Sequence, residues 1–129
     1  MVVQTHTDTQ VVHNLIPYAH VADPARSIDF YRRLGFVVED TNEYKGRLNW
    51  ASLRSGEARL MIALATAPIN PHQQAVLFYL YTRDVVALRE QLLADGIAVG
   101  EIQYPPYMAS GEFRVEDPDG YCLLICQIG

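Results

Sequence analysis

The chain has 129 residues, half of them hydrophobic and 19% charged, with a formal net charge of −5. This length and composition suit a single globular domain and are atypical of a disordered chain. The charge includes no basic stripe of the kind a general nucleic-acid-binding protein needs, and no apolar run reaches the roughly 20 residues of a membrane helix. The first ten residues also lack the basic start and apolar centre of a signal peptide. We therefore expect a cytoplasmic protein without nucleic-acid or membrane partners.

A polar arm is predicted over residues 1–12, followed by a first structural module over 13–64. Its helix has clear boundaries, because Asp23 is a good N-cap, Pro24 suits the first turn and Gly35 ends the apolar period. The order of elements is strand, helix and three strands (βαβββ). The strands are predicted over 16–21, 36–39, 48–54 and 58–64.

A second module is predicted over 75–128, after a linker at 65–74 that contains two prolines. The stretch IPYAHVAD aligns with LFYLYTRD at an offset of 61 residues, and the same offset superposes the helix-ending glycines. The chain is therefore interpreted as two copies of one unit. Its helix begins near Asp84 and ends at Gly96, and its strands are predicted over 76–81, 97–103, 112–116 and 121–127.

The two cysteines, Cys122 and Cys126, lie four residues apart on the last predicted strand. A strand rises about 3.3 Å per residue, so their Cα atoms are roughly 13 Å apart, beyond the reach of a disulfide. Both are predicted to be reduced.

The paired βαβββ modules, the stretch VADPARSIDFYRRLGF and the closing EDPDGYCLLI resemble the vicinal oxygen chelate superfamily, which includes glyoxalase I, bleomycin-resistance proteins and extradiol dioxygenases. The resemblance covers residues 14–127. It implies an α+β fold in which two tandem βαβββ modules form a curled mixed sheet around a cavity, commonly in a homodimer. These motifs mark the superfamily and leave the individual activity open.

The resemblance also implies where metal-dependent relatives place their four ligands, and this sequence departs from that pattern. The implied positions carry Ile16, Leu77 and Leu124, and the fourth falls in 58–64, a strand without His, Asp, Glu or Cys. The register of that fourth position is left open. Hard divalent cations need oxygen or imidazole donors, which aliphatic side chains do not supply. The expectation is a cavity with no metal and no cofactor.

Strand alternation predicts which side chains share a face with those positions. The first strand of each module contributes tyrosine or histidine, and the last strand contributes Cys122, Leu124 and Cys126. A mostly apolar face with a few polar groups is typical of a small-molecule pocket. The candidate ligand-binding residues are Tyr18, His20, Trp50, Tyr79, Tyr81, Tyr107 and Arg114.

Each candidate also has a structural interpretation. The tyrosines suit a closed core as well as a ligand, and His20 is more typical of a structural hydrogen bond than of a catalytic base. Trp50 can pack in the core, and Arg114 can pair with a neighbouring glutamate. The stretch around Tyr107 is either a lid or an ordinary connection.

The leading hypothesis is a protein that binds a small, partly aromatic molecule in a metal-free cavity, as bleomycin-resistance proteins do, for sequestration or resistance. No catalytic residue is assigned. One alternative is a metal-dependent or His/Tyr-based lyase, isomerase or dioxygenase of the same superfamily. Another is a regulatory or immunity partner that acts through its surface.

Overall fold

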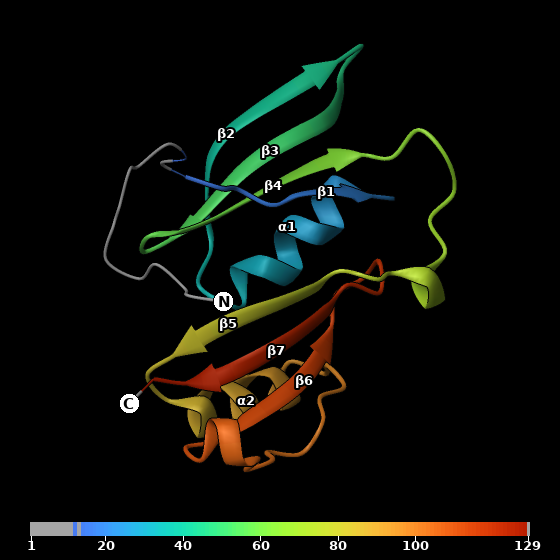
Figure 1. Ribbon diagram of the computed structural model, residues 1–129. Helices are drawn as coiled ribbons and strands as arrows, with labels where there is room; N and C mark the ends of the chain where they lie inside the picture. Colours follow the sequence, from blue (N-terminus) through green and yellow to red (C-terminus); the bar gives the residue numbers. More distant parts are fainter. Residues whose placement is uncertain (1–11, 13, 129) are drawn as a thin grey trace, which may run out of the picture.

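The computed structural model of the protein describes residue 12 and residues 14–128 (Figure 1). The arm predicted at 1–12 therefore lies almost wholly outside the described residues. No helix in the described part of the chain is long and apolar enough to cross a membrane. The elements are β1 (Tyr18–Val21), α1 (Pro24–Arg32), β2 (Val37–Tyr44), β3 (Arg47–Ser55), β4 (Ala58–Leu64), η1 (Pro71–Gln73), β5 (Leu77–Thr82), α2 (Val85–Ala94), η2 (Pro106–Met108), β6 (Glu112–Glu116) and β7 (Cys122–Gln127).

The strands form two mixed sheets, one from each module. Sheet A has the order β1-β4-β3-β2, and sheet B has the order β5-β7-β6. In both sheets the first strand runs parallel to the last, while the other pairs are antiparallel. This is the α+β arrangement of tandem modules that the sequence predicted.

The two helices begin and end alike, which confirms the repeat at the level of single hydrogen bonds. Asp23 and Asp84 cap α1 and α2 by accepting bonds from backbone N–H groups of the first turn. Gly35 (φ +89°) and Gly96 (φ +81°) then reverse the chain in the left-handed region that glycine adopts freely. In each module the N–H of the residue after the glycine donates to a carbonyl five residues earlier. All these positions are related by the offset of 61.

One hydrophobic core unites the modules, with α1 lying between the two sheets (Figure 1). Leu53 of β3, Tyr31 of α1 and Leu123 of β7 are each at most 1% exposed and belong to the same cluster. The alternate residues of the strands face away from this core. Each sheet therefore has one buried face and one face open to a ligand or a partner.

The turn between β6 and β7, residues 117–121 (DPDGY), joins the second module to the start of the first. Asp117 accepts a 2.7 Å hydrogen bond from the hydroxyl of Tyr31 on α1. Asp119 accepts bonds from the backbone N–H of Ala22 (2.8 Å) and the hydroxyl of Ser27 (3.4 Å). Buried polar groups need such partners, and the two aspartates are 5% and 1% exposed. We call this segment the junction turn, because its hydrogen bonds to Ala22, Ser27 and Tyr31 hold α1 against sheet B.

Burial changes the acid–base behaviour of the junction turn. Desolvation raises the pKa of Asp117 from its ordinary value of 3.8, and hydrogen bonds from Tyr31 and from two backbone N–H groups of the turn offset part of that rise. Burial, followed by the charge of Asp117, raises the pKa of Tyr31. The hydroxyl of Tyr31 is therefore the donor of the pair, and Asp117 is the acceptor.

The strand predicted over 97–103 is reduced to two isolated bridges, Val99 with Val115 and Gln103 with Glu112. Val99 and Gln103 are four positions apart in the sequence, whereas their partners Val115 and Glu112 are three positions apart. The one extra residue in the first segment interrupts the ladder. β2 instead runs well beyond the predicted 36–39. The reason is the two-residue turn at Lys45 (φ +53°) and Gly46 (φ +74°), which keeps β2 and β3 paired to their ends.

Candidate functional site

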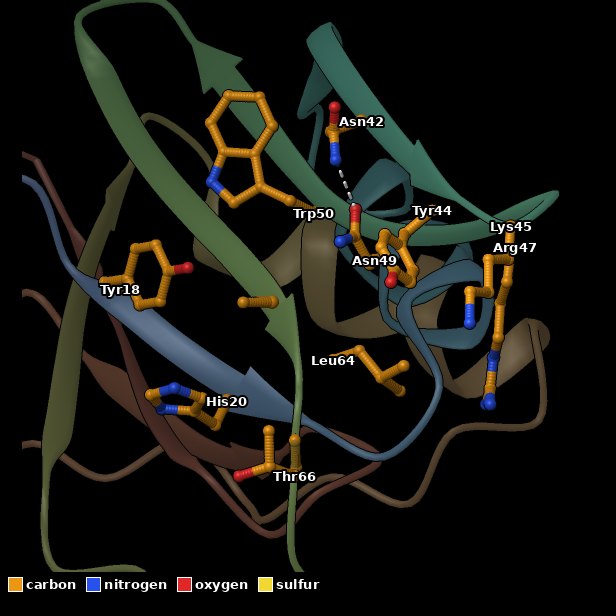
Figure 2. A pocket seen from close by; sticks show the side chains of 12 residues that line it. Tyr18, His20, Asn42, Tyr44, Lys45, Arg47, Asn49, Trp50, Leu64 and Thr66 are labelled. Atoms are coloured by element: carbon orange, nitrogen blue, oxygen red, sulfur yellow. Dashed lines mark hydrogen bonds between the residues drawn. The ribbon is translucent and has the colours of Figure 1, made fainter.

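The open face of sheet A carries a hollow of about 760 Å³, within the usual range for small-molecule pockets (Figure 2). Its walls come from β1, β2, β3, the turn between β2 and β3, the end of β4 and the chain just after it. The lining side chains are Tyr18, His20, Asn42, Tyr44, Lys45, Arg47, Asn49, Trp50, Ala63, Leu64, Ala65 and Thr66.

A row of paired residues across all four strands explains why the face is hollow. His20 pairs with Ala63, Ala63 pairs with Trp50, and Trp50 pairs with Asn42. Neighbouring strands lie about 4.8 Å apart, so His20 and Trp50 stand roughly 10 Å apart with only the methyl group of Ala63 between them. That gap is wide enough for a planar ring lying between the two side chains.

Aromatic side chains stand on one side of the hollow. The rings of Tyr18 and His20 meet edge to face, with centroids 5.5 Å apart. Figure 2 shows these two side chains with Trp50 around one part of the hollow and Lys45 and Arg47 at the opposite end. Tyr18 is 53% exposed, so its ring is available for contact.

Polar groups mark the middle and the far end of the hollow. Asn42 donates from Nδ2 to Oδ1 of Asn49 at 2.8 Å (Figure 2). This bond uses one hydrogen of Asn42 and one lone-pair site of Asn49, which leaves further amide donors and acceptors for a ligand. Lys45 lies over the ring of Tyr44, with Nζ 5.3 Å from the ring centroid. In the described part of the chain neither Lys45 nor Arg47 forms a salt bridge, so this end is positive.

The strand registers identify the fourth position implied by the family's metal site, which the sequence left open. Tyr79 pairs with Leu124 in sheet B, and its counterpart Tyr18 pairs with Met61 in sheet A. The four implied positions are therefore Ile16, Met61, Leu77 and Leu124. Three are aliphatic and one is a thioether, which do not suit a hard divalent cation. Within residues 12 and 14–128, no group of three or more His, Cys, Asp or Glu side chains converges. The residues present do not fit the family's metal.

The seven predicted ligand-binding residues fall into two groups. Tyr18, His20 and Trp50 line the hollow on sheet A. The other four belong to the second module: Tyr79 and Tyr81 on β5, Arg114 on β6 and Tyr107 in η2. Tyr79 and Tyr81 are 49% and 61% exposed. Within this chain the second group does not line the hollow.

Two predicted side-chain roles can be checked directly. Arg114 pairs with Glu116 at 3.5 Å, and both side chains are about 60% exposed, which makes a weak surface pair. Cys122 and Cys126 are free and buried, as the spacing predicted. Desolvation raises the pKa of both thiols, so neither is an activated nucleophile.

Sequence reasoning missed the polar half of the hollow, which consists of Asn42, Lys45, Arg47 and Asn49. The available signal was the Lys45-Gly46 dipeptide in the centre of TNEYKGRLNW. A turn there extends β2 and β3 as a hairpin, and strand alternation then brings side chains from both strands to the open face.

The sequence profile of the Glyoxalase/Bleomycin resistance protein/Dioxygenase superfamily matches residues 11–125. No curated protein sequence matches the chain significantly. Similar solved structures include a bleomycin-binding protein complexed with bleomycin (19% identity, TM-score 0.74, 90% of this chain and 98% of that chain). They also include TnmS3, an antibiotic-binding protein from Streptomyces sp. CB03234 (22%, 0.72, 95% and 100%), and SMU.1112c (28%, 0.74, 92% and 100%). The likeness to the first two, at such low identity, establishes the fold alone.

Proposed function

Because the chain belongs to the glyoxalase/bleomycin resistance protein/dioxygenase superfamily, we propose that it is one of its ligand-binding members. The ligand is a small, partly aromatic molecule, held without a metal in the hollow on sheet A. Binding alone is enough for sequestration or resistance, and it requires no catalytic residue. Two neighbours of the same fold, a bleomycin-binding protein and an antibiotic-binding protein, support this kind of role.

The observation that carries the proposal is the row His20–Ala63–Trp50. Two aromatic side chains flank a methyl group at the floor of an open hollow, and the asparagine pair stands beside them. Aromatic rings offer large contact surfaces at little entropic cost, while amide groups fix the orientation of a bound ring system.

The enzymatic alternative has no comparable support. His20 is exposed, and within the described residues no side chain donates to or accepts from its imidazole. A general base is ordinarily oriented by such a bond.

We test the function by filling the hollow. Ala63→Leu places a larger side chain between His20 and Trp50, whereas Ala58→Leu makes the same change on β4 outside the hollow. Metal-free bleomycin and a panel of aromatic antibiotics are screened by thermal shift, because a molecule that binds only the native state raises the melting temperature. A shift that Ala63→Leu abolishes and Ala58→Leu preserves supports the proposal. Equal shifts in both variants, or no shift in the wild type with any compound, would count against it.

A homodimer is part of the same proposal. The open face of sheet B exposes Leu77, Tyr79 and Tyr81 at 46%, 49% and 61%. A contiguous apolar patch of this kind is typical of a protein interface, and a second copy of the chain is the partner expected. Light scattering of the purified protein should give twice the 14.5 kDa chain mass. A monomer at micromolar concentration would refute this part. The cytoplasmic location stays a prediction from the sequence.

A further inference from the structure

The open face of sheet B contains one buried charge that the fold leaves incompletely satisfied. Glu112 on β6 is 4% exposed, and its Oε1 has no hydrogen-bond partner among the described residues. It forms no salt bridge within that part of the chain either. Burial of an unpaired carboxylate is unfavourable, so such a group is expected to have a compensating partner.

The surroundings of Glu112 are aromatic and lie on the side of the sheet away from α2. Glu112 pairs with Cys126 of β7, which pairs with Tyr81 of β5, so these three side chains form one row across the sheet. The next row contains Tyr79 and Arg114. Phe113, which lies between Glu112 and Arg114 on β6, is 1% exposed and points into the core instead.

Tyr107 of η2 lies over this part of the face. Desolvation raises the pKa of Tyr107, and so do the charge of Glu112, the proximity of Tyr79 and a side-chain hydrogen bond with Glu112. Tyr107 as a whole residue is 70% exposed. One side of the carboxylate is therefore occupied by the phenol, and the other faces no donor.

The charges nearby do not compensate Glu112. Arg114, two residues along the same face, is the cation of β6, and it forms an ion pair with Glu116, on the side away from Glu112. Among the described residues no salt bridge joins Arg114 to Glu112, and Oε1 of Glu112 has no hydrogen-bond partner. An external donor is needed to complete the site.

We propose that Glu112 accepts a cationic or N–H donor group of a planar aromatic ligand on the open face of sheet B, reached when Tyr107 moves aside. The carboxylate supplies the charge, and Tyr79 and Tyr81 supply faces that attract a cation or stack on a ring. The inference rests on the proposed ligand-binding function. It adds a contact on sheet B, on the face proposed to meet the second copy, so that the ligand lies between the two copies, and it adds the charge of the ligand group held there.

The test compares two planar three-ring probes of opposite charge, protonated aminoacridine and anthracene carboxylate, by equilibrium dialysis. Wild type is compared with Glu112→Gln, which keeps the shape and removes the charge. Glu116→Gln is the matched control, since it removes an exposed charge from the same strand and face. Glu112→Gln should weaken binding of the cation at least tenfold and leave the anion within about twofold, while Glu116→Gln changes neither by more than about twofold.

The outcomes separate this inference from the function on which it rests. If Glu112→Gln binds the cation as wild type does, or if wild type prefers the anion, Glu112 is not the anchor, although the protein still binds ligands. If wild type binds neither probe but does bind bleomycin, the assigned ligand charge is wrong. If it binds none of the three, the proposed function is wrong as well. Should Glu112→Gln fail to fold, Glu112→Asp keeps the charge, shortens the side chain and is expected to weaken cation binding at least threefold. Unchanged cation affinity in that variant overturns the inference.

Discussion

The two modules share their helices and differ in the connections between their strands. The helix caps and the glycines that end the helices coincide at the offset of 61 residues. In the first module a two-residue turn at Lys45-Gly46 completes a four-stranded sheet. In the second, the longer connection with Pro105 and Pro106 leaves only two isolated bridges in place of the fourth strand. An internal repeat therefore predicts the shared scaffold, while the connections determine the binding faces.

The same difference separates the two open faces chemically. The paired β2 and β3 and the turn between them carry two asparagines and two cations to the rim of an exposed hollow. In the second module the connection that contains Pro105 and Pro106 instead brings Tyr107 next to Glu112. One sheet thus presents a preformed site with a positive end, and the other presents a covered negative group. The predictions below test this contrast and the junction that holds the modules together.

The largest effect is expected at the turns that join the last two strands of each module. Gly120 in the junction turn has φ +85°, and a Cβ atom there would lie 2.5 Å from the carbonyl oxygen of Pro71. Gly56, in the corresponding turn of the first module, has φ +59°, and a Cβ atom added to it would have no other atom within 4 Å. Gly120→Ala should lower the free energy of unfolding by several kcal/mol or prevent folding, whereas Gly56→Ala should cost about 1–2 kcal/mol from the backbone alone. Urea unfolding measures both, and similar losses would contradict the role of the junction.

A smaller loss is expected when one hydrogen bond of the junction is removed. Tyr31→Phe leaves the buried carboxylate of Asp117 without its phenol donor, which should cost about 1–3 kcal/mol. Tyr121→Phe removes the exposed bond to the carbonyl of His20 and should cost less than about 1 kcal/mol. Thermal or urea unfolding measures the loss of stability in each variant. A larger loss for Tyr121→Phe than for Tyr31→Phe would contradict the role given to the buried hydrogen bond of the junction.

Much of this scaffold, though less of the site, could be predicted from the sequence. Asp23, Gly35 and their counterparts act locally, so their roles follow from residue type and spacing. The pairing of Tyr31 with Asp117 depends on residues 86 positions apart, which no local pattern reveals. Three aromatic residues of the hollow, Tyr18, His20 and Trp50, were among the predicted ligand-binding residues. Its floor at Ala63 escaped prediction for a similar reason, because the effect of a small residue appears only once its neighbours across the sheet are known.

The reactivity of the two cysteines reports whether Tyr107 covers Glu112. Cys126 lies in the same row as Glu112, and Tyr107 is close to it, whereas Cys122 lies two rows away. Both thiols are buried with raised pKa values, so alkylation of the native protein should be slow at neutral pH. Tyr107→Ala should raise the rate at Cys126 several-fold and leave that at Cys122 nearly unchanged. Peptide mass spectrometry after iodoacetamide treatment reports both rates, and an equal change at the two sites would exclude a local cover.

The smallest effect concerns pH. Burial raises the pKa of Asp117 above its unfolded value of 3.8, so the native state binds this proton more tightly than the unfolded state does. Its contribution to stability is therefore complete below pH 3.8 and is lost as the pH rises through the native pKa. The difference in unfolding free energy between wild type and Asp117→Asn should change in the same window, moving against wild type as the pH rises. A difference that stays constant with pH would show that Asp117 is not perturbed.

Trp50, the one tryptophan of the chain, gives the most direct test of the central claim, that the hollow on sheet A binds an aromatic molecule without a metal. Its fluorescence is followed while metal-free bleomycin is added in excess chelator, for wild type and for Ala63→Leu. We predict saturable quenching in the wild type that the chelator does not affect and that Ala63→Leu weakens at least tenfold. Quenching that appears only when a divalent cation is supplied, or that persists in Ala63→Leu, would contradict the account.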